Sequence, residues 1–499
     1  MNLKRAKKAS ATSGLYAIIP LLLLLLLPGG CVSQETVYLH SERSSVPIAL
    51  MYPLYSEPPN SPELLAYIEE RFQIRLELQA IAPETYNRRS RIGLIAGNGP
   101  DALVWTHFPQ AELFHYARTG LLRPLDPLLE EAEHLAAIPE EIWTNAMIDD
   151  QLYGIPRPRA REDQAYFIRK DWLDALGLPH PHTTDELAEA AIRFASDDPD
   201  GNGRPDTYGF AAGDALETIY NISHAFDAGN SWRLQEDGSL LNSHLAPGRE
   251  AALRWMRTLY SQGGIDPLFG TLNSTQVQEQ FTSGRAGILL SEISNFHPFL
   301  QRLQEQVPGS EIIMLPPPAG PEGKSGLSAK IGFFGQFVIP SRVPEDKARR
   351  IVELLDWMSG EEAEALRRSG LEGIHHTQHA DGTFELYAAR MEAEGIGAYF
   401  PMNGYDPYYY VSTTAPEETR LQQRSMLDQV RSLGVSDPAL HFMPHSRYKI
   451  GSIYASQIES FYVQYVRSEI QPESFDEFRA AWLEKGGREL TEEVNRWYR

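Results

Sequence analysis

Residues 46–105 carry a regular series of strand and helix signals. The sequence reads VPIALM at 46–51, SPE at 61–63, IRLELQ at 74–79, GNGP at 97–100 and ALVW at 102–105. Serine followed by proline is a strong start signal for a helix, and the alternation at 74–79 has the period of a half-exposed strand. The glycines and proline of 97–100 end a second helix. This β-α-β-α-β series predicts an α/β fold with a largely parallel sheet.

Similar signals recur in the rest of the chain. Thr183-Thr184-Asp185-Glu186 has the spacing of a helix capping box. A second amphipathic helix is expected after Pro344-Glu345, with Ala348, Ile351, Leu355 and Met358 on its apolar face. Because 499 residues exceed what one hydrophobic core accommodates, we predict two lobes, each a mostly parallel sheet flanked by helices.

The first thirty residues have the three parts of an export signal. A basic stretch precedes an apolar core at 15–27, and small residues follow at 29–30. The apolar core is about thirteen residues long, which is shorter than a transmembrane helix requires. We therefore expect residues 1–30 to be a cleaved signal peptide and residues 31–45 to form a polar tether.

Cys31 is the only cysteine in the chain, so no internal disulfide can form. It ends the segment Leu27-Pro28-Gly29-Gly30-Cys31, which resembles the bacterial lipoprotein signal, in which the thiol is diacylated and the chain is cut just before it. We expect Cys31 to be the lipid anchor. The alternative is an ordinary secreted protein with one exposed thiol.

The overall charge limits the classes of partner. The formal net charge is −22, and removing residues 1–30 makes it more negative because that segment contains basic residues and no acidic ones. An acidic surface argues against nucleic acid as a partner and against binding an anionic membrane through a basic face. Contact with the membrane is therefore expected through the lipid anchor alone.

Residues 198–206, DPDGNGRPD, match most of the calcium loop of an EF-hand. Oxygen-bearing side chains fall at positions 1, 3, 5 and 9, glycine falls at position 6, and a backbone carbonyl is available at position 7. The bidentate glutamate of position 12 is replaced by Gly209, so a complete EF-hand is not expected. The alternatives are a structural calcium site and a metal-free turn rich in aspartate and asparagine. The expected calcium ligands are Asp198, Asp200, Asn202, Arg204 through its carbonyl, and Asp206.

Two kinds of side chain are candidates for ligand binding. Arg157, Arg159 and Arg161 alternate with other residues in an extended segment, so they project to one side and could meet a carboxylate or sulfate. The alternative is that they pair with acidic residues of this acidic protein. Aromatic residues in or near expected loops could stack on a sugar ring. These are Trp105, Trp232, Phe296, Tyr405 and Tyr408.

The aromatic candidates have a second interpretation. Trp105 precedes His107 and Phe108 at the carboxyl end of an expected strand, where ligands bind in α/β folds. Equally, these rings could pack beneath the following helix, against Leu113 and Tyr116. For any single aromatic residue, a place in the hydrophobic core is the more common outcome.

We find no catalytic sequence motif. The chain lacks a Gly-x-Ser-x-Gly elbow, a His-Glu-x-x-His motif and a glycine-rich phosphate loop. His375 and His376, with His379 nearby, could form a metal cluster, but a surface loop is the better interpretation of their spacing. We expect a protein that is not an enzyme.

Several segments together resemble one known family, the extracellular solute-binding proteins of ABC sugar importers (family 1 type). The resemblance is strongest to a long lipoprotein branch related to alginate-oligosaccharide-binding proteins. The matching segments keep the family's order along most of the chain. They are residues 97–105, 120–126, 152–156, 167–178, 264–267, 281–287 and 486–498.

This resemblance implies a fold of the type II periplasmic-binding-protein class, with a cleft between two lobes. The lobes would comprise residues 46–155 with roughly 330–400, and residues 156–329 with roughly 401–499. The function implied is a monomeric, lipid-anchored substrate-binding component on the outer face of the cytoplasmic membrane. It would capture an oligosaccharide and deliver it to ABC permease subunits. The calcium loop of the alginate binders is similar to residues 198–206, although relatives often have glutamate where Thr207 stands.

Two other functions remain as alternatives: a surface glycan-degrading enzyme, and a ligand-sensing receptor without transport. The arginines at 157, 159 and 161 favour an oligosaccharide that contains uronic acid.

Overall fold

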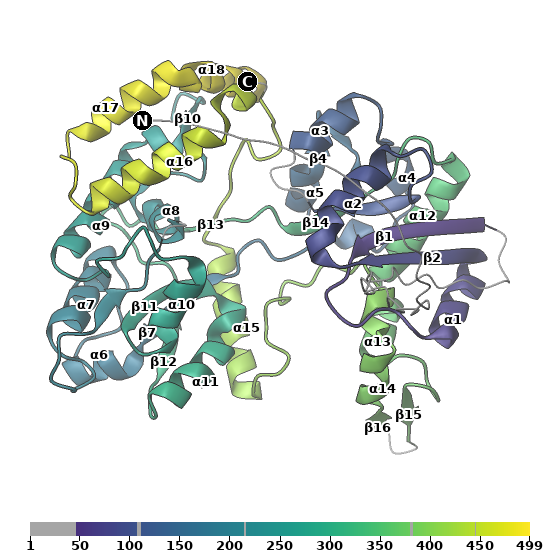
Figure 1. Cartoon of the computed structure of the whole chain (residues 1–499), viewed down its shortest axis with the longest axis horizontal. Coiled ribbons are helices and arrows are strands. Elements are labelled where there is room, and N and C mark those ends of the chain that lie inside the picture. The colour runs from purple at the N-terminus through teal and green to yellow at the C-terminus, as the bar shows by residue number, and fades with distance from the viewer. Residues whose placement is uncertain (1–45, 107–110, 214–215, 380–382, 445) are drawn as a thin grey trace, which may run out of the picture. The chain divides into compact units, whose positions relative to one another are not determined.

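The computed structural model describes residues 46–106, 111–213, 216–379, 383–444 and 446–499, with residues 447–455 described as backbone only (Figure 1). The expected export signal, Cys31, His107 and Phe108 lie outside these ranges. Within them, no helix combines the length and apolar character needed to cross a membrane.

The first sheet has five strands in the order β2-β1-β3-β14-β6 (Figure 1). Strand β1 pairs in parallel with β2 and β3, whereas β14 runs antiparallel to β3 and β6. The parallel part is the predicted series, because parallel neighbours require the crossover helices that lie between them. The strands span β1 Val46–Pro53, β2 Ile74–Ile81, β3 Ala102–Trp105, β6 Gly154–Pro158 and β14 Phe333–Val338.

The crossover helices begin where the sequence signals them. Helix α1 starts at Pro62 with Ser61 as its N-cap, and it buries Leu65 and Ile68 against the sheet. The helix predicted after Pro344 is α12, and all four of its predicted apolar positions are buried. The helices that accompany this sheet are α1 Pro62–Phe72, α2 Pro83–Ile95, α3 Ala111–Arg118, α4 Asp126–Leu129, α5 Glu140–Ala146, α12 Glu345–Met358, α13 Glu361–Ser369 and α14 Ala388–Ala393.

The second sheet has the order β12-β7-β11-β8. Here β7 runs antiparallel to both β12 and β11, and only β11 and β8 are parallel. The prediction of a mostly parallel sheet was therefore wrong for this part of the chain. The direction of β7 relative to β11 and β12 is set by tertiary pairing, which no local sequence signal specifies. The strands are β7 Gln164–Arg169, β8 Tyr208–Phe210, β11 Ala286–Glu292 and β12 Ile312–Leu315.

Helices and short strands surround the second sheet. The predicted capping box at the start of α7 is confirmed, since the Glu186 amide donates to Thr183 Oγ1 at 3.2 Å and the Thr183 amide donates to the Glu186 carboxylate at 3.0 Å. The helices are α6 Lys170–Leu176, α7 Thr184–Ser196, α8 Glu217–Ile222, α9 Pro247–Ser261, α10 Ser274–Thr282, α11 Phe296–Gln306 and α15 Glu417–Arg431. Short strand pairs are β9 Trp232–Leu234 with β10 Leu240–Asn242, and β13 Leu327–Ser328 with β17 Gly434–Val435.

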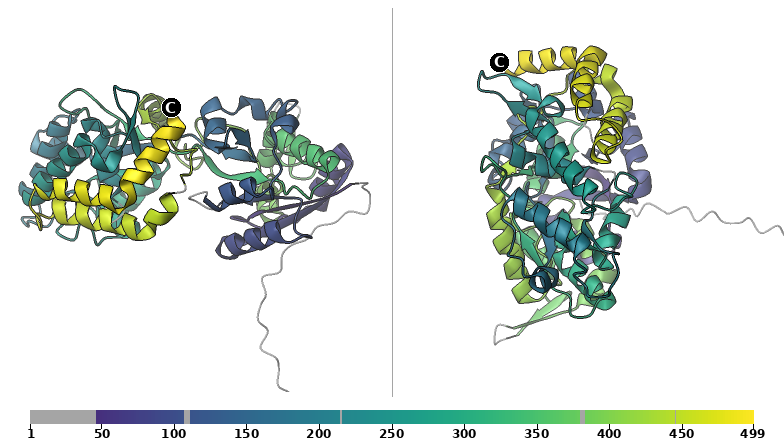
Figure 2. Two further views of the ribbon diagram at one scale, coloured as in Figure 1. Left: turned by 90° about the horizontal axis from the view of Figure 1, so that it is seen from above. Right: turned by 90° about the vertical axis from the view of Figure 1, so that its left-hand side faces the viewer.

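The C-terminal helices α16 (Arg447–Val466), α17 (Ser474–Trp482) and α18 (Arg488–Tyr498) complete this part of the chain. Figure 2 shows them in yellow tones beside the segment that contains α9. Helix α16 packs against α9, and Arg257 of α9 donates to the carbonyl of Tyr465 at 2.9 Å. These helices therefore extend the hydrophobic core of the second sheet.

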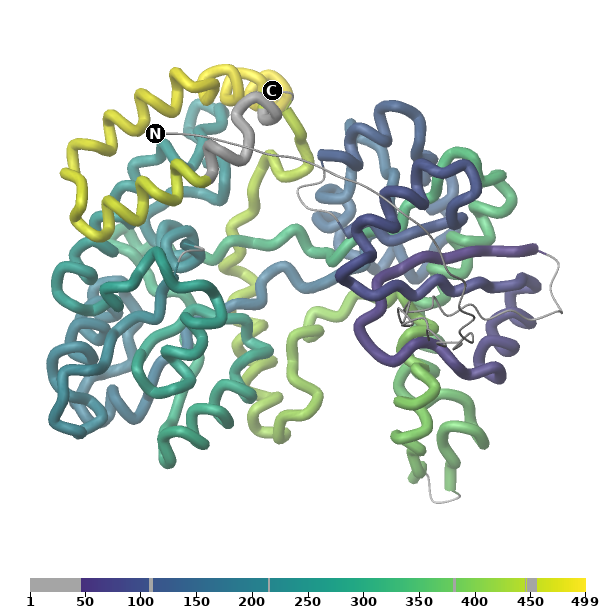
Figure 3. The backbone as a smooth tube through the Cα atoms, viewed as in Figure 1, coloured from purple at the N-terminus to yellow at the C-terminus, as the bar shows by residue number. Residues whose placement is uncertain are grey.

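The buried apolar residues form two cores, one around each sheet. The chain passes from one core to the other between Ile155 and Ala165, between Leu327 and Phe333, and between Met402 and Met426 (Figure 3). Met443, which lies between Ala439 and Ile458 of the second core, also belongs to the first core. We call residues 156–164, 328–332 and 403–425 the crossing segments. They carry the polar and aromatic side chains described next.

Candidate ligand-binding site

Arg157 lies in β6 and is only half-buried as a residue, but its Nε and Nη1 atoms are fully buried. Neither atom donates a hydrogen bond to any residue in the described part of the chain. Burial, followed by the positive charge of Arg159, lowers the pKa of Arg157 to about 10. Burying two guanidinium nitrogens without a hydrogen-bond partner costs free energy, so this arginine is not explained by its contribution to stability.

Arg159 lies beside Arg157 and is held by the third crossing segment. Its Nη1 donates to the Pro158 carbonyl at 2.7 Å and to Asn403 Oδ1 at 2.9 Å. Its guanidinium carbon lies 4.0 Å from the centroid of the Tyr409 ring. Burial lowers the pKa of Arg159, and the phenols of Tyr409 and Tyr410 oppose this effect. Arg159 therefore links the first and third crossing segments.

Arg161 does not join the other two arginines. Its Nη1 forms an ion pair with Glu141 at 2.9 Å, and its Nη2 donates to Ser436 Oγ at 2.7 Å. Its Nε donates to the Lys330 carbonyl at 3.2 Å. Ion pairing, the alternative considered for all three arginines, is thus the arrangement found at Arg161.

Large aromatic rings are exposed near the two arginines. Tyr55 is 63% exposed, Tyr409 is 45% exposed and Phe334 is 43% exposed. The rings of Tyr55 and Phe334 meet edge to face, with their centroids 6.1 Å apart. Both Tyr55 and Tyr409 are close enough to Arg157 to influence its pKa. Exposed apolar rings beside a cation provide the two kinds of contact that a sugar acid needs.

Lys330, on the second crossing segment, is the centre of an ion cluster. Its Nζ donates to Asp163 Oδ2 at 2.6 Å and to Glu292 Oε1 at 2.9 Å. Asp163 is 1% exposed, and burial raises its pKa to about 6 although Lys330 acts in the opposite direction. The lysine ammonium also lies 5.9 Å from the centroid of the Tyr410 ring. The cluster joins the second sheet to the crossing segments.

A cavity of about 410 Å³ lies next to Lys330. Its lining is partly polar and includes Asn221, Asn230, Ser328 and Lys330. A second cavity of about 300 Å³ shares Gln164 and Glu217 with the first. Amides, hydroxyls and carboxylates in such a lining are suitable partners for sugar hydroxyl groups.

Three predicted ligand-binding aromatics are core residues instead. Trp105 is 1% exposed and packs edge to face on Tyr116 at 5.5 Å, which confirms the alternative interpretation of this residue. Trp232 is 8% exposed in the core of the second sheet. Phe296 is 3% exposed and packs on Phe167 at 5.6 Å. Each therefore belongs to a hydrophobic core and not to an exposed binding surface.

The two predicted tyrosines are partly buried. Tyr405 packs against the first core, and Tyr408 packs against the second. The hydroxyl of Tyr408 donates to Asp428 Oδ1 at 3.0 Å, and the Arg424 guanidinium lies 4.8 Å from its ring centroid. Tyr408 therefore connects the third crossing segment to α15.

Sequence patterns missed Tyr55, Phe334, Asp163 and Lys330. A signal existed for Phe334, because Phe333 and Phe334 begin a strand in which alternate side chains face opposite sides. The other three residues lie in segments without a periodic pattern. Their proximity to the arginines arises only from the tertiary fold.

The predicted calcium loop is closed by its own polar groups. The backbone amides of Asn202 and Gly203 donate to Asp198 Oδ1 at 3.1 Å and to Asp198 Oδ2 at 2.9 Å. The side-chain Nδ2 of Asn202 donates to Asp200 Oδ2 at 2.8 Å and to Asp206 Oδ1 at 3.1 Å. Burial and the neighbouring carboxylates raise the pKa of Asp200. The carboxylate and amide oxygens fit the chemistry of calcium. Among the described residues, however, no three acidic or histidine side chains are arranged to hold a metal ion.

The end of this loop explains why the EF-hand pattern stops. Thr207 is buried, and its hydroxyl donates to the Phe194 carbonyl at 2.7 Å, away from the loop. A Cβ atom at Gly209 would lie 2.3 Å from the Ala191 carbonyl oxygen. Position 12 therefore has no space for the glutamate of a complete EF-hand.

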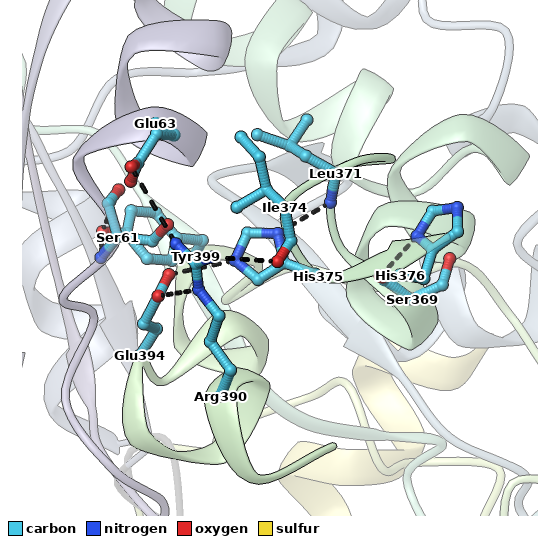
Figure 4. A network of polar contacts seen from close by, with 10 residues as sticks. All are labelled: Ser61, Glu63, Ser369, Leu371, Ile374, His375, His376, Arg390, Glu394 and Tyr399. Carbon is cyan, nitrogen blue, oxygen red and sulfur yellow. Dashed lines mark hydrogen bonds and ion pairs between the residues drawn. The ribbon is translucent and has the colours of Figure 1, made fainter. Parts of the chain in front are cut away.

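His375 is fully buried, so its placement in a surface loop was wrong. Figure 4 shows its ring between Leu371 and Glu394. Its Nδ1 accepts the Leu371 amide proton at 2.9 Å, which leaves Nε2 to donate to Glu394 Oε2 at 3.0 Å. Arg390 also pairs with Glu394, and despite partial burial these contacts lower the pKa of Glu394 to about 2. Both ring nitrogens are engaged, so His375 is a structural residue and not a metal ligand.

Comparisons with known proteins agree on one family. Residues 57–365, more than half of the chain, match the family model of bacterial extracellular solute-binding proteins. The polygalacturonan/rhamnogalacturonan-binding protein YtcQ of Bacillus subtilis is 26% identical over 90% of this chain and 91% of its own length. Lipoprotein LipO of the same organism is 27% identical over 97% of this chain and 98% of its own length.

A solved structure shows the same fold. The Streptococcus pneumoniae ABC-transporter substrate-binding protein FusA, in complex with kestose, matches with a TM-score of 0.64 at 18% identity. The match covers 91% of this chain and 98% of FusA. An EF-hand mutant of FusA, in complex with fructo-nystose, matches with a TM-score of 0.62.

Proposed function

Because this chain belongs to the family of bacterial extracellular solute-binding proteins, we propose that it captures an oligosaccharide and delivers it to the permease subunits of an ABC importer. The names of YtcQ and FusA, which describe binding of polysaccharide or oligosaccharide, support this assignment. The observation that carries it is the group of exposed rings, Tyr55, Phe334 and Tyr409, close to Arg157 and Arg159 at the crossing segments.

The proposed mechanism is closure of two lobes over the ligand. The lobes comprise residues 46–155 with about 330–400, and residues 156–329 with about 401–499. Bending of the crossing segments allows the lobes to close, and the ligand favours the closed form because it contacts both lobes. The closed form is then the one that the permease binds. The chain acts as a monomer in this scheme.

The chain releases its ligand unchanged under this proposal. The matched relatives carry the names of binding proteins and of a lipoprotein, which supports a function without catalysis. A surface glycan-degrading enzyme would instead produce shorter saccharides. A sensing receptor without transport would bind the same ligand but would not be required for uptake.

We also propose that Cys31 carries a lipid that holds the chain on the outer face of the cytoplasmic membrane. The sole cysteine at the end of an export signal supports this, as does the similarity to lipoprotein LipO. Substitution of Cys31→Ser should release the chain into the medium and abolish labelling by radioactive palmitate. Retention of the label in this variant would exclude Cys31 as the anchor.

The loop at 198–206 is proposed to hold one structural calcium ion. Asp198, Asp200, Asn202, the Arg204 carbonyl and Asp206 would supply the oxygens, and the cation would offset the burial and the carboxylate repulsion that raise the pKa of Asp200. Asn202 Nδ2 now lies between two of these carboxylates, so binding requires rotation of this amide.

Uptake tests the proposed function. Cells that lack this chain should fail to import the oligosaccharide selected by the soluble form, residues 32–499, from a glycan array. Restoring the full-length chain should restore import, whereas Cys31→Ser should restore it only in part. Unchanged import without the chain would contradict a role in transport.

A further inference from the structure

Arg157 differs from other arginines of this acidic chain in the charges around it. Arg118 and Arg161, for example, pair with Asp149 and Glu141. The groups that act electrostatically on Arg157 are instead a second arginine and the phenols of Tyr86, Tyr409 and Tyr55. In the part of the chain that the structure describes, no carboxylate forms an ion pair with Arg157, and its buried Nε and Nη1 atoms donate no hydrogen bond. The local charge is therefore positive in a chain whose net charge is −22.

Arg159 does not neutralise this charge but adds to it. Its guanidinium donates hydrogen bonds to a backbone carbonyl and to the amide oxygen of Asn403, both of which are uncharged. Two adjacent guanidiniums repel one another, and each has lost part of its hydration through burial. An anion bound here would remove both penalties.

The exposed aromatic rings around the two arginines indicate the chemistry of the rest of the ligand. Tyr55, Phe334 and Tyr409 expose ring faces near the two arginines. A guanidinium binds a carboxylate through paired hydrogen bonds, and aromatic rings pack on the apolar faces of sugar rings. A sugar that bears a carboxylate satisfies both kinds of surface.

We propose that Arg157, assisted by Arg159, binds a carboxylate of the ligand, so that the site selects oligosaccharides containing uronic acid. This inference rests on the proposed function, because it concerns the ligand of the same site. Arg157 is the specificity-determining residue in this scheme. Tyr55, Phe334 and Tyr409 contact the sugar rings whether or not the sugar is charged.

The experiment compares one sugar backbone with and without its charge. Trigalacturonate, its methyl ester and its carboxyl-reduced form are titrated into the wild type, Arg157→Gln and Arg157→Lys. Arg118→Gln removes the same charge from an exposed ion pair and serves as the matched control. A sulfated galactose trisaccharide provides a second anion.

We expect the wild type to bind trigalacturonate at least tenfold more tightly than either neutral form. Arg157→Gln should lose at least tenfold in affinity for the acid and should bind the neutral forms as the wild type does. Arg157→Lys should show an intermediate loss, since it keeps the charge but not the planar donor group. Arg118→Gln should match the wild type.

Thermal stability separates binding from a structural role. Removing an unpaired buried cation should leave the melting temperature of Arg157→Gln equal to or above that of the wild type, whereas a structural arginine would lower it when removed. Equal binding of charged and neutral sugars, preference for the sulfated sugar, or unaltered acid affinity in Arg157→Gln would overturn the inference. Tight binding of neutral sugars alone would leave the proposed function intact, and failure to bind any oligosaccharide would reject both.

Discussion

The guanidinium carbon of Arg159 lies 4.0 Å from the centroid of the Tyr409 ring, while 45% of Tyr409 remains exposed. This contact positions an exposed ring next to the cation pair. Tyr409→Ala should weaken oligosaccharide binding by about 5- to 30-fold, which corresponds to about 1–2 kcal/mol for lost ring contacts. Calorimetric titration measures this loss. Tyr409→Phe keeps the ring and should bind within about twofold of the wild type, so an equal loss in both variants would contradict a role for the ring face.

The ion cluster around Lys330 should contribute strongly to stability. Lys330→Met leaves Asp163, which is 1% exposed, without its cation, and should lower the free energy of unfolding by about 3 kcal/mol. Lys170→Met removes an exposed lysine that also contacts two carboxylates, and should cost far less stability than Lys330→Met. Urea denaturation compares the two variants. Adding Asp163→Asn to Lys330→Met should recover much of the loss, and no recovery would show that charge is not the cause.

Acid should destabilise the second core through His224. Burial and the nearby Arg249 lower the pKa of His224 to about 3, so the folded state keeps this ring neutral while the unfolded state binds a proton below pH 6.5. The stability that depends on neutral His224 is therefore complete above pH 6.5 and is lost as the pH falls towards 3. At pH 5 the loss amounts to about 2 kcal/mol. Asp163 acts in the opposite direction between about pH 4 and 6, because burial raises its pKa to about 6.

A substitution of His224 isolates its contribution to the pH dependence of stability. His224→Gln should be less stable than the wild type at pH 7, because it disturbs the contact of His224 Nε2 with Ser328 Oγ at 2.9 Å. The difference from the wild type should shrink by about 2 kcal/mol at pH 5. The exposed His115 provides a control for the substitution itself, and His115→Gln should leave the free energy of unfolding at pH 7 close to that of the wild type. A constant difference for His224→Gln would disprove the assignment.

Calcium should stabilise the chain through residues 198–206. At one hundred times its dissociation constant, calcium should raise the free energy of unfolding by about 2.7 kcal/mol, and magnesium should have a much smaller effect. Asp200→Asn should abolish this gain, whereas Asp237→Asn, in an exposed turn between β9 and β10, should retain it. Differential scanning fluorimetry measures the shift. An identical response of the two variants would place the calcium elsewhere.

Local signals predicted the helices and the first strands well. Proline after a serine cap starts α1, and a reciprocal hydrogen-bond pair caps α7. These features depend on a few neighbouring residues, so the sequence contains what is needed to find them. The direction of β7 relative to β11 and β12 depends on tertiary pairing, and no local pattern encodes that.

The candidate site was predictable only in part. The two-residue spacing brought Arg157 and Arg159 together, but β6 ends at Pro158 and the irregular chain beyond it turns Arg161 towards Glu141. Trp105 belongs to β3, which lies between β1 and β14, so every residue of this strand is buried. Apolar rings look alike in sequence, and only packing separates core residues such as Trp105 from exposed ones such as Phe334.

The most direct test of the central claim is a calorimetric titration of residues 32–499 with the oligosaccharide selected from a glycan array. The sugar is then recovered from the calorimeter cell, and its length is measured by chromatography. We predict saturable binding of about one ligand per chain and recovery of the sugar at its original length. Absence of binding to every glycan, or recovery of shortened products, would contradict the proposal that this chain captures an oligosaccharide for import.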